Sequence, residues 1–391
     1  MKKRNLTWMI VVPAVVSLIL TLSCYYYWNA RFTFGFGDMA MRASSAFKDL
    51  LFEQEKFDDV IAINVSYDRT LEPYADEFGI PVGVIDITDR SKLLAFMDSL
   101  SAWNNYKYIV CDIDMSGFST PYDETLFSRM AVMRDIVASG SDMEAVPQKL
   151  KGIVASSDYD QLLSGDGFLK YNYFTSDGYE TMAYRMWKDL DGGSINKHWW
   201  GYTSGKRLAV CSLIPDLKFI TRSDWSSDGE KNVYNLGADI LSVPESFRLF
   251  EGKIVLIGDF REYDNHDTIK NEVAGTAIIY NAYLALKNGD HTVKLLVLIL
   301  LFLVFGAEIS FALRKYWYIK KEDDEEDKKE RSLSSKLASS LLEAVLSWIG
   351  YAGVMAVVCF FIYVFFGFFV NAIIIGSLIA FVSPFVDPEE Q

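Results

Sequence analysis

The stretch "FEGKIVLIGDFREYDNHDT", Phe250–Thr268, decides the fold class of this chain. Its apolar run from Ile254 to Ile257 is typical of a buried strand, and Gly258 ends that run. The polar loop that follows raises the question of whether the strand ends at an active site, a ligand-binding mouth or a structural turn. The loop contains four side chains that suit such a site: Asp259, Asp264, His266 and Asp267.

Apolar runs of the same kind occur earlier in the chain, and each predicts another buried strand. One run, Asp59–Ser66, precedes a predicted helix that begins near Asp89, and the next run, Tyr106–Asp114, follows that helix. This strand–helix–strand order favours parallel strands in an α/β sheet. Residues 206–214 predict a further buried strand. We therefore predict an α/β fold: a three-layer-like domain around a mixed, partly parallel sheet.

Other segments are long and apolar enough to cross a membrane, which takes roughly 20 residues. The chain carries one charge, Glu308, between Lys294 and Arg314, and none between Glu343 and Asp387. The last of these runs is long enough for two helices joined by a tight turn. We predict four transmembrane helices, near Leu6–Tyr27, Leu295–Leu313, Ala344–Phe365 and Phe368–Val386.

Basic residues indicate the orientation, because positively charged flanks stay in the cytoplasm. They precede the first span and recur in the segment 314–336 after the second span. We expect an uncleaved first helix and a bacterial inner (cytoplasmic) membrane protein with its main domain in the periplasm. The predicted parts are a first helix (1–28), an exported domain (29–291), a second helix (292–314), a charged cytoplasmic loop (315–341), a helical hairpin (342–386) and a cytoplasmic tail (387–391).

The net charge of −14 falls on the predicted exported domain, since the remaining residues balance. An acidic domain repels the phosphate backbone, so we do not expect nucleic acid as a partner. Cys111 and Cys211 lie in apolar runs, where buried thiols are expected and a bridge between them is the alternative. No pair of cysteines has the spacing of metal ligands.

Glu308 is the one carboxylate deep in a predicted span. A charge in the membrane is costly, and such a residue is a candidate functional group by default. The sequence leaves open whether Glu308 faces Ser347 or Tyr351 of another span, faces a partner subunit, or extends to the inner membrane boundary.

Several of these segments together resemble a CHASE2 domain, an extracytoplasmic sensory domain found upstream of bacterial signalling outputs. The matching pieces are "VIAINV", "ITDR", "YIVCDID", Asp123 at the start of a helix, Asp177-Gly178, and the closing blocks "GKIVLIGD" and "YNAYLAL". The resemblance covers about 30–290 and implies a sensory role, with one span before the domain and three after it. The chain departs from the family pattern at its end, because it stops at Gln391 where family members commonly carry an output domain.

Four interpretations of the loop after Gly258 compete. A metallophosphoesterase would need two metals and several imidazoles, and the chain has three histidines. A single cation site, a ligand-binding mouth at the carboxyl ends of the strands, and a structural turn are the other three. The candidate ligand-binding residues are Asp112, Asp114, Asp259, Asp264, His266 and Asp267.

No motif of a catalytic nucleophile, a zinc protease or a phosphate-binding loop is present, so we expect no enzyme, no cofactor and no metal. The expected function is a membrane receptor-like protein that passes a conformational signal to a separate membrane or cytoplasmic partner. Its input would be an unknown small ligand or an envelope protein, and a homo-oligomer is a further option. The alternative is a structural subunit of an envelope membrane complex that binds no small molecule.

Overall fold

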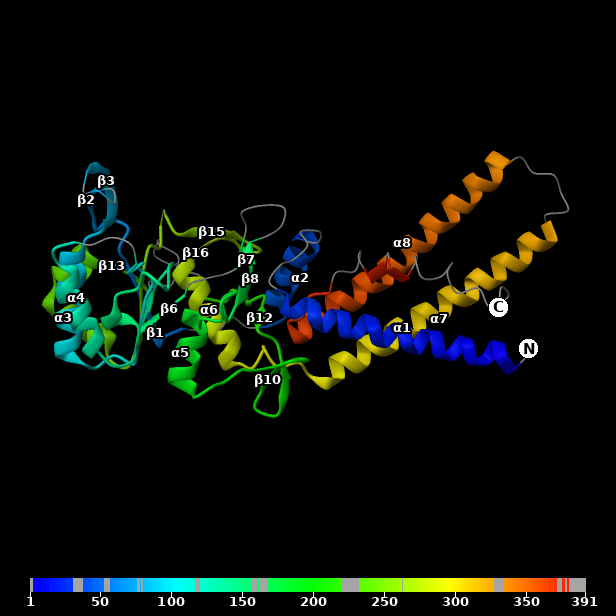
Figure 1. The fold of residues 1–391 in the computed structure, drawn as a ribbon, viewed down its shortest axis with the longest axis horizontal. Coiled ribbons are helices and arrows are strands. Elements are labelled where there is room, and N and C mark those ends of the chain that lie inside the picture. The colour runs from blue at the N-terminus through cyan, green and yellow to red at the C-terminus, as the bar shows by residue number, and fades with distance from the viewer. Residues whose placement is uncertain are drawn as a thin grey trace.

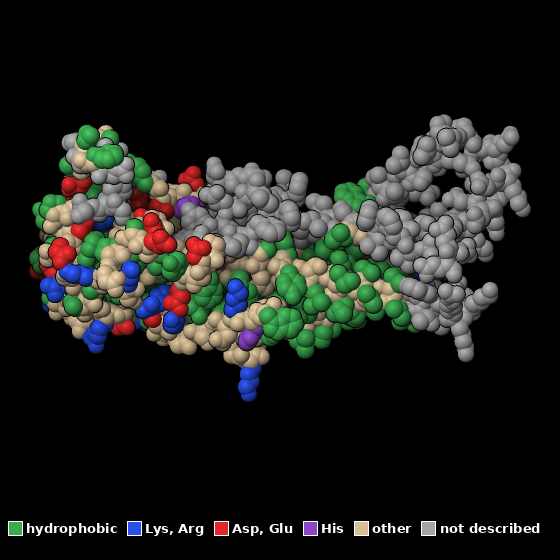
Figure 2. All heavy atoms as spheres, viewed as in Figure 1, with side chains coloured by type: hydrophobic (Ala, Val, Ile, Leu, Met, Phe, Trp, Pro, Cys, Tyr) green, Lys and Arg blue, Asp and Glu red, His purple; other side chains and the backbone are tan. Residues whose placement is uncertain are grey.

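The computed structural model is elongated, with an α/β domain at one end and long helices at the other (Figure 1). Charged side chains cover the α/β domain, whereas the described surface of the long helices is mainly hydrophobic (Figure 2). The structure describes the whole chain except 1–2, 31–37, 53–56, 76–77, 79, 117–119, 157–159, 162–167, 220–231, 262, 327–332, 371–374, 377 and 380–391.

The α/β domain is built on a six-stranded sheet in which every pair of neighbours is parallel. The predicted α/β class is confirmed, but the central sheet is wholly parallel, and antiparallel pairs occur in small separate sheets. The two strands on either side of the first predicted helix are parallel but not adjacent, because the apolar strand β14 lies between them. In spatial order the strands are β13 (Val233–Asn235), β1 (Val60–Asn64), β14 (Ile254–Gly258), β4 (Tyr108–Cys111), β5 (Ile136–Ser139) and β6 (Val154–Ala155).

Helices cover both faces of this sheet, which confirms the three-layer arrangement (Figure 1). Helices α3 (Arg90–Trp103) and α4 (Asp123–Val132) pack on one face with Ile61 and Ile63 of β1. Helices α5 (Met182–Asp191) and α6 (Gly275–Lys287) pack on the other face with Val60 and Ala62 of the same strand. This alternation is the two-residue period of a strand that is buried on both faces.

Two capping and packing details position the helices. The Asp89 side chain accepts hydrogen bonds from the backbone N–H groups of Ser91 and Lys92, so it caps α3 as expected. Asn281, in the middle of α6, is fully buried. Its amide accepts a hydrogen bond from Phe219 N at 2.9 Å and donates one to Phe219 O at 2.7 Å, which fixes the segment before residue 220 onto α6.

Short strands and turns surround the central sheet. Residues 206–214 do not form the single buried strand that we expected: β11 (Arg207–Ala209) and β12 (Ser212–Leu213) belong to different small sheets, and the Cys211 N–H between them bonds to Asn29. All four cysteines are free. The other elements are β2 (Arg69–Ala75), β3 (Pro81–Thr88), β7 (Asp160–Gln161), β8 (Phe168–Asn172), β9 (Asn196–His198), β10 (Gly201–Ser204), β15 (Asn265–Thr268), β16 (Asn271–Ala274) and the turns η1 (Gln148–Leu150), η2 (Leu236–Leu241) and η3 (Pro244–Phe250).

The long helices are α1 (Lys3–Asn29), α7 (Leu295–Glu326) and α8 (Leu333–Phe366), and an amphipathic helix, α2 (Asp38–Leu51), lies beside α8. Within the described residues, three helical segments are long and apolar enough to cross a membrane, not four. They are Ile10–Asn29, Leu295–Arg314 and Trp348–Phe366. Both α7 and α8 continue into the segment 315–341 that we expected to be a charged loop.

The predicted fourth helix, 368–386, lies mostly outside the described residues. The turn before it is present, because α8 ends at Phe366 and Gly367 has a φ of 74°, a conformation that favours glycine. Beyond the turn, Gly376 lies against α8: a Cβ added there would be 3.0 Å from the Cα of Ala352. The chain therefore returns along α8, but a fourth span is not established by the described residues.

Candidate functional site

Polar side chains follow the strands at the carboxyl edge of the central sheet, where ligands bind in open α/β sheets. Asp112 follows β4 and Asp259 follows β14. Gly258, the last residue of β14, is needed for space and not for a bend, because it is not among the glycines with positive φ. A Cβ at this position would be 1.9 Å from Oγ1 of Thr276, the second residue of α6. The glycine thus lets α6 approach the edge of the sheet.

The Thr276 hydroxyl uses that space to donate a hydrogen bond to Asp112 at 3.0 Å. Burial, and to a smaller extent the nearby carboxylate of Asp264, raise the pKa of Asp112 to about 8, although hydrogen bonds from Thr276 and Ser139 lower it in part. Strong perturbation of a carboxyl pKa by burial and a like charge is typical of binding sites.

Asp264 and His266 complete this group. The Nε2 atom of His266 lies 3.1 Å from Oδ1 of Asp264, and both side chains are half-buried. Gly275 again provides room, because a Cβ there would be 2.4 Å from the Asp264 carboxylate. We call Asp112, Asp264, His266 and Thr276 the edge cluster.

The remaining predicted residues have hydrogen-bond or ion-pair partners outside the edge cluster. Asp267 points to the other side of β15, as the two-residue period of a strand requires, and its exposed carboxylate lies 3.5 Å from Arg42 of α2. Asp259 accepts a hydrogen bond from the Ser66 hydroxyl at 2.6 Å and from its own loop at Arg261 N.

Asp114 is also held by its neighbours. The hydroxyls of Ser116 and Ser141 each donate to it at 2.6 Å. Partial burial raises the pKa of Asp114, but these hydrogen bonds outweigh burial and the net pKa is lowered. The described residues contain no group of three or more His, Cys, Asp or Glu side chains that could hold a metal ion.

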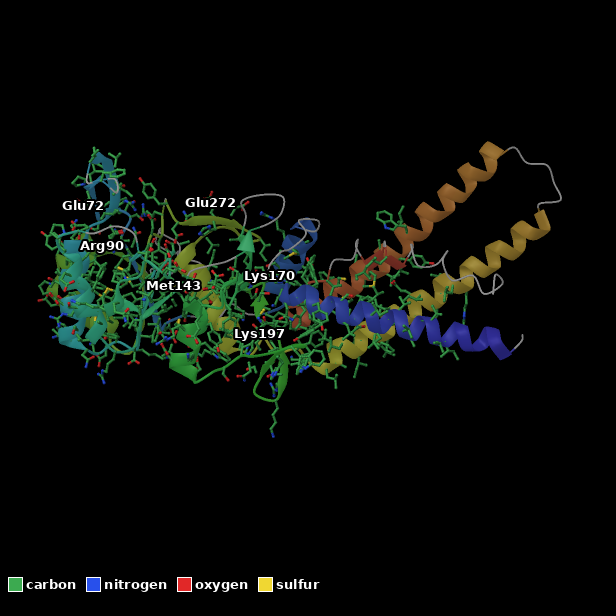
Figure 3. All side chains as sticks on the ribbon, viewed as in Figure 1. Glu72, Arg90, Met143, Lys170, Lys197 and Glu272 are labelled. Carbon is green, nitrogen blue, oxygen red and sulfur yellow. The ribbon has the colours of Figure 1, made fainter. Side chains whose placement is uncertain are left out.

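Two residues that hold this region together were not identified from the sequence. Asn64 interrupts the apolar run of β1, which was the available signal, and its Oδ1 accepts hydrogen bonds from Ser66 and from Phe260 N. No sequence pattern indicated that Arg90 is buried, because an arginine in the first turn of a helix usually lies at the surface. It lies at the start of α3 (Figure 3) and is buried, with Nη2 donating to the Asp114 carbonyl at 2.8 Å and Nε 3.8 Å from Asp123.

Glu308 is buried within the helices, at 8% exposure. Neither of its carboxylate oxygens has a hydrogen-bond partner among the residues that the structure describes. Tyr351 and Cys359 of α8 are close enough to Glu308 to interact with it electrostatically. This position corresponds to the first of the three alternatives, in which Glu308 faces another span.

No protein-family model matches this chain, and no curated protein or solved structure is significantly similar to it. The function is therefore argued from the geometry of the chain itself.

Proposed function

We propose that the chain is a membrane receptor-like protein whose exported α/β domain passes a conformational signal through its helices to a separate partner protein. The edge cluster is the proposed input site, for a small hydroxylated or cationic ligand or for an envelope protein. The observation that carries this proposal is the close connection between the α/β domain and the ends of the membrane helices. The resemblance to CHASE2 sensory domains agrees with it.

The end of α1 is enclosed by the domain. The Tyr25 hydroxyl donates to Ala209 O at 3.0 Å and accepts from Tyr202 N at 2.9 Å. The Ser212 hydroxyl donates to Trp28 O at 2.8 Å, and Lys170, which Figure 3 labels, donates to Tyr27 O at 3.2 Å. We call these contacts the α1 junction.

The α1 junction also reaches the chain beyond α8. Trp28 Nε1 donates to Phe369 O at 2.9 Å, and the rings of Trp28 and Phe368 lie 4.5 Å apart. A movement of the domain against α1 would therefore displace the end of α8 as well.

One hydrophobic cluster connects the sheet to the membrane helices. It contains Val60 and Leu256 of the central sheet, Tyr280 of α6, Leu301 of α7 and Met355 of α8. Packed interiors transmit strain because they have little free volume. The short link from α6 to α7, residues 288–294, adds a covalent connection. A ligand would shift such a body only through a difference in affinity for two of its states.

A disulfide between α1 and α7 reports this coupling. A Cβ at Gly306 would lie 3.3 Å from the Ser17 hydroxyl, so Ser17→Cys with Gly306→Cys, in a chain whose natural cysteines are replaced, is expected to form a disulfide in membranes. In this background we combine Ser212→Ala with Lys170→Met, which removes two contacts of the α1 junction. We predict that the rate at which the disulfide forms then changes by roughly fivefold or more, the lower range of allosteric coupling. Lys206→Met, at an exposed turn of the same domain, is the control. Equal rates in the junction variant and the control would contradict the proposal.

The alternative, a structural subunit of an envelope complex, is favoured by one observation. Asp114 and Asp259 at the carboxyl edge are already bonded to protein groups, as in a structural turn. Purification of the full chain in mild detergent separates the two functions: a stable partner in fixed stoichiometry favours the subunit, and a chain that purifies without one favours the receptor.

A further inference from the structure

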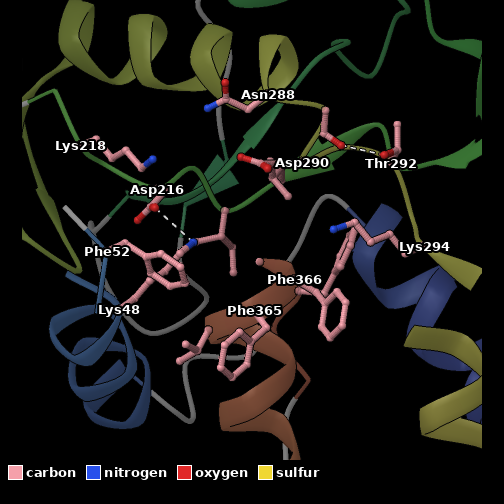
Figure 4. A pocket seen from close by; sticks show the side chains of 16 residues that line it. Lys48, Phe52, Asp216, Lys218, Asn288, Asp290, Thr292, Lys294, Phe365 and Phe366 are labelled. Atoms are coloured by element: carbon pink, nitrogen blue, oxygen red, sulfur yellow. Dashed lines mark hydrogen bonds and ion pairs between the residues drawn. The ribbon is translucent and has the colours of Figure 1, made fainter. Parts of the chain in front are cut away.

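A pocket of about 400 Å³ lies where the α/β domain meets the membrane helices (Figure 4). This volume is within the range of small-ligand sites, roughly 300–1,000 Å³. Its walls come from the end of α2, the segment 213–218, the link between α6 and α7, and the end of α8. Since Leu295 begins one candidate span and Phe366 ends another, the pocket is at the level where these helices leave the membrane.

The pocket is lined by three lysines and two aspartates, which leaves one positive charge. Lys48 and Asp216 form an ion pair at 3.1 Å. Lys218 and Asp290 point toward one another from opposite walls, and Lys294 reaches in beside Phe366 (Figure 4). No hydrogen bond or ion pair of the Asp290 carboxylate is present among the described residues, and burial raises its pKa, with the pKa lowered in part by Lys48.

The side of the pocket toward the helices is apolar. Phe52, just after α2, and Phe365 of α8 are 46% and 54% exposed. Phe361, one turn before Phe365 on the same helix, is 52% exposed. Because the end of α8 is a candidate membrane span, these rings face the region of the acyl chains. The pocket therefore combines a cationic chamber at the membrane surface with an apolar exit along α8.

We propose that this pocket binds the headgroup of one anionic phospholipid with a hydroxylated head, of the phosphatidylglycerol type. The phosphodiester carries the single negative charge that complements the lining residues, and Lys218 and Lys294 are its partners. The headgroup hydroxyls donate to Asp290, and the acyl chains leave past Phe365. This site is separate from the edge cluster and does not depend on the proposed function.

Native mass spectrometry of the full chain in detergent micelles tests the proposal, with dioleoylphosphatidylglycerol and dioleoylphosphatidylethanolamine added in turn. We expect one phosphatidylglycerol to bind at concentrations at which phosphatidylethanolamine does not. Lys218→Gln and Lys294→Gln, tested singly, are each expected to weaken this binding roughly tenfold, the effect of losing one charge-assisted hydrogen bond. Lys206→Gln, an exposed lysine in the turn after β10, is the matched control and should bind as the natural chain does.

Three results would overturn the proposal. Equal binding of the two lipids would remove the preference for an anionic head. Unchanged binding in both pocket variants would place the lipid elsewhere on the helices. Displacement of the lipid by inorganic phosphate at equal concentration would identify free phosphate, and not a lipid, as the ligand. Using two single variants keeps the test valid if one of them fails to fold.

Discussion

Arg90→Ala is expected to lower the free energy of unfolding by about 3–5 kcal/mol, the usual cost of removing one partner from a buried ion pair. Arg90 is 6% exposed and Asp123 is 3% exposed, so the carboxylate would stay buried without its cation. The Asp114 carbonyl would also lose a hydrogen bond from Nη2. Thermal and denaturant unfolding of the full chain in detergent measures the effect.

Arg129→Ala is the matched control, because Arg129 pairs with Asp98 on the surface, at 41% and 47% exposure. Such pairs contribute at most about 1 kcal/mol. Arg90→Lys keeps the charge but not the planar fork, and it should be intermediate. An Arg90→Ala variant no less stable than Arg129→Ala would show that Arg90 does not hold the loop after β4.

Asp112→Asn is expected to stabilise the protein above pH 8 and to change it little at pH 5. The folded-state pKa of Asp112 is about 8, against 3.8 for a freely exposed aspartate, so the folded chain keeps a proton that the unfolded chain releases. Stability from this group is therefore present at low pH and is lost as the pH rises toward 8. The pKa shift sets an upper bound of about 6 kcal/mol on the effect. Asparagine resembles the protonated acid and has no such proton to lose.

The measurement is the Tm of the full chain in detergent at pH 5 and pH 9, for the natural protein and for Asp112→Asn. Asp177→Asn, in an exposed turn, serves as the control. Between pH 5 and pH 9, the Tm of Asp112→Asn should fall less than the Tm of the natural protein. An identical loss would mean that the pKa of Asp112 is not raised in the folded protein.

Much of the fold follows from local pattern. The runs at Val60–Asn64, Tyr108–Cys111 and Ile254–Gly258 are strands because uninterrupted apolar residues suit a sheet that is covered on both faces. Their order in the sheet is a long-range property, so the insertion of β14 between β1 and β4 could not be predicted. The run at 206–214 was predicted wrongly because its backbone bonds to Asn29 of α1, a partner that no local pattern reveals.

The sequence predicted where the candidate site lies, but not which residues form it. Asp112 and Asp259 follow strands and could be placed at one edge by the parallel order, but only Asp112 belongs to the edge cluster. The period of β15 then separates His266 from Asp267, and that strand was not predicted because its residues, "NHDT", are polar. The roles of Thr276 and Arg90 depend on the approach of α6 and α3 to the edge, which is a matter of packing. The fourth predicted span remains outside the described residues.

Thiol labelling of two single-cysteine variants tests whether the α/β domain is held on one side of the membrane and the end of α7 on the other. In a chain without its natural cysteines, Asp177→Cys reports the domain, and Glu326→Cys reports the end of α7 beyond the candidate span Leu295–Arg314. We predict that a membrane-impermeant maleimide labels the first in intact spheroplasts and the second only after permeabilisation. Labelling of both positions from the same side would show that the membrane does not separate the α/β domain from the end of α7.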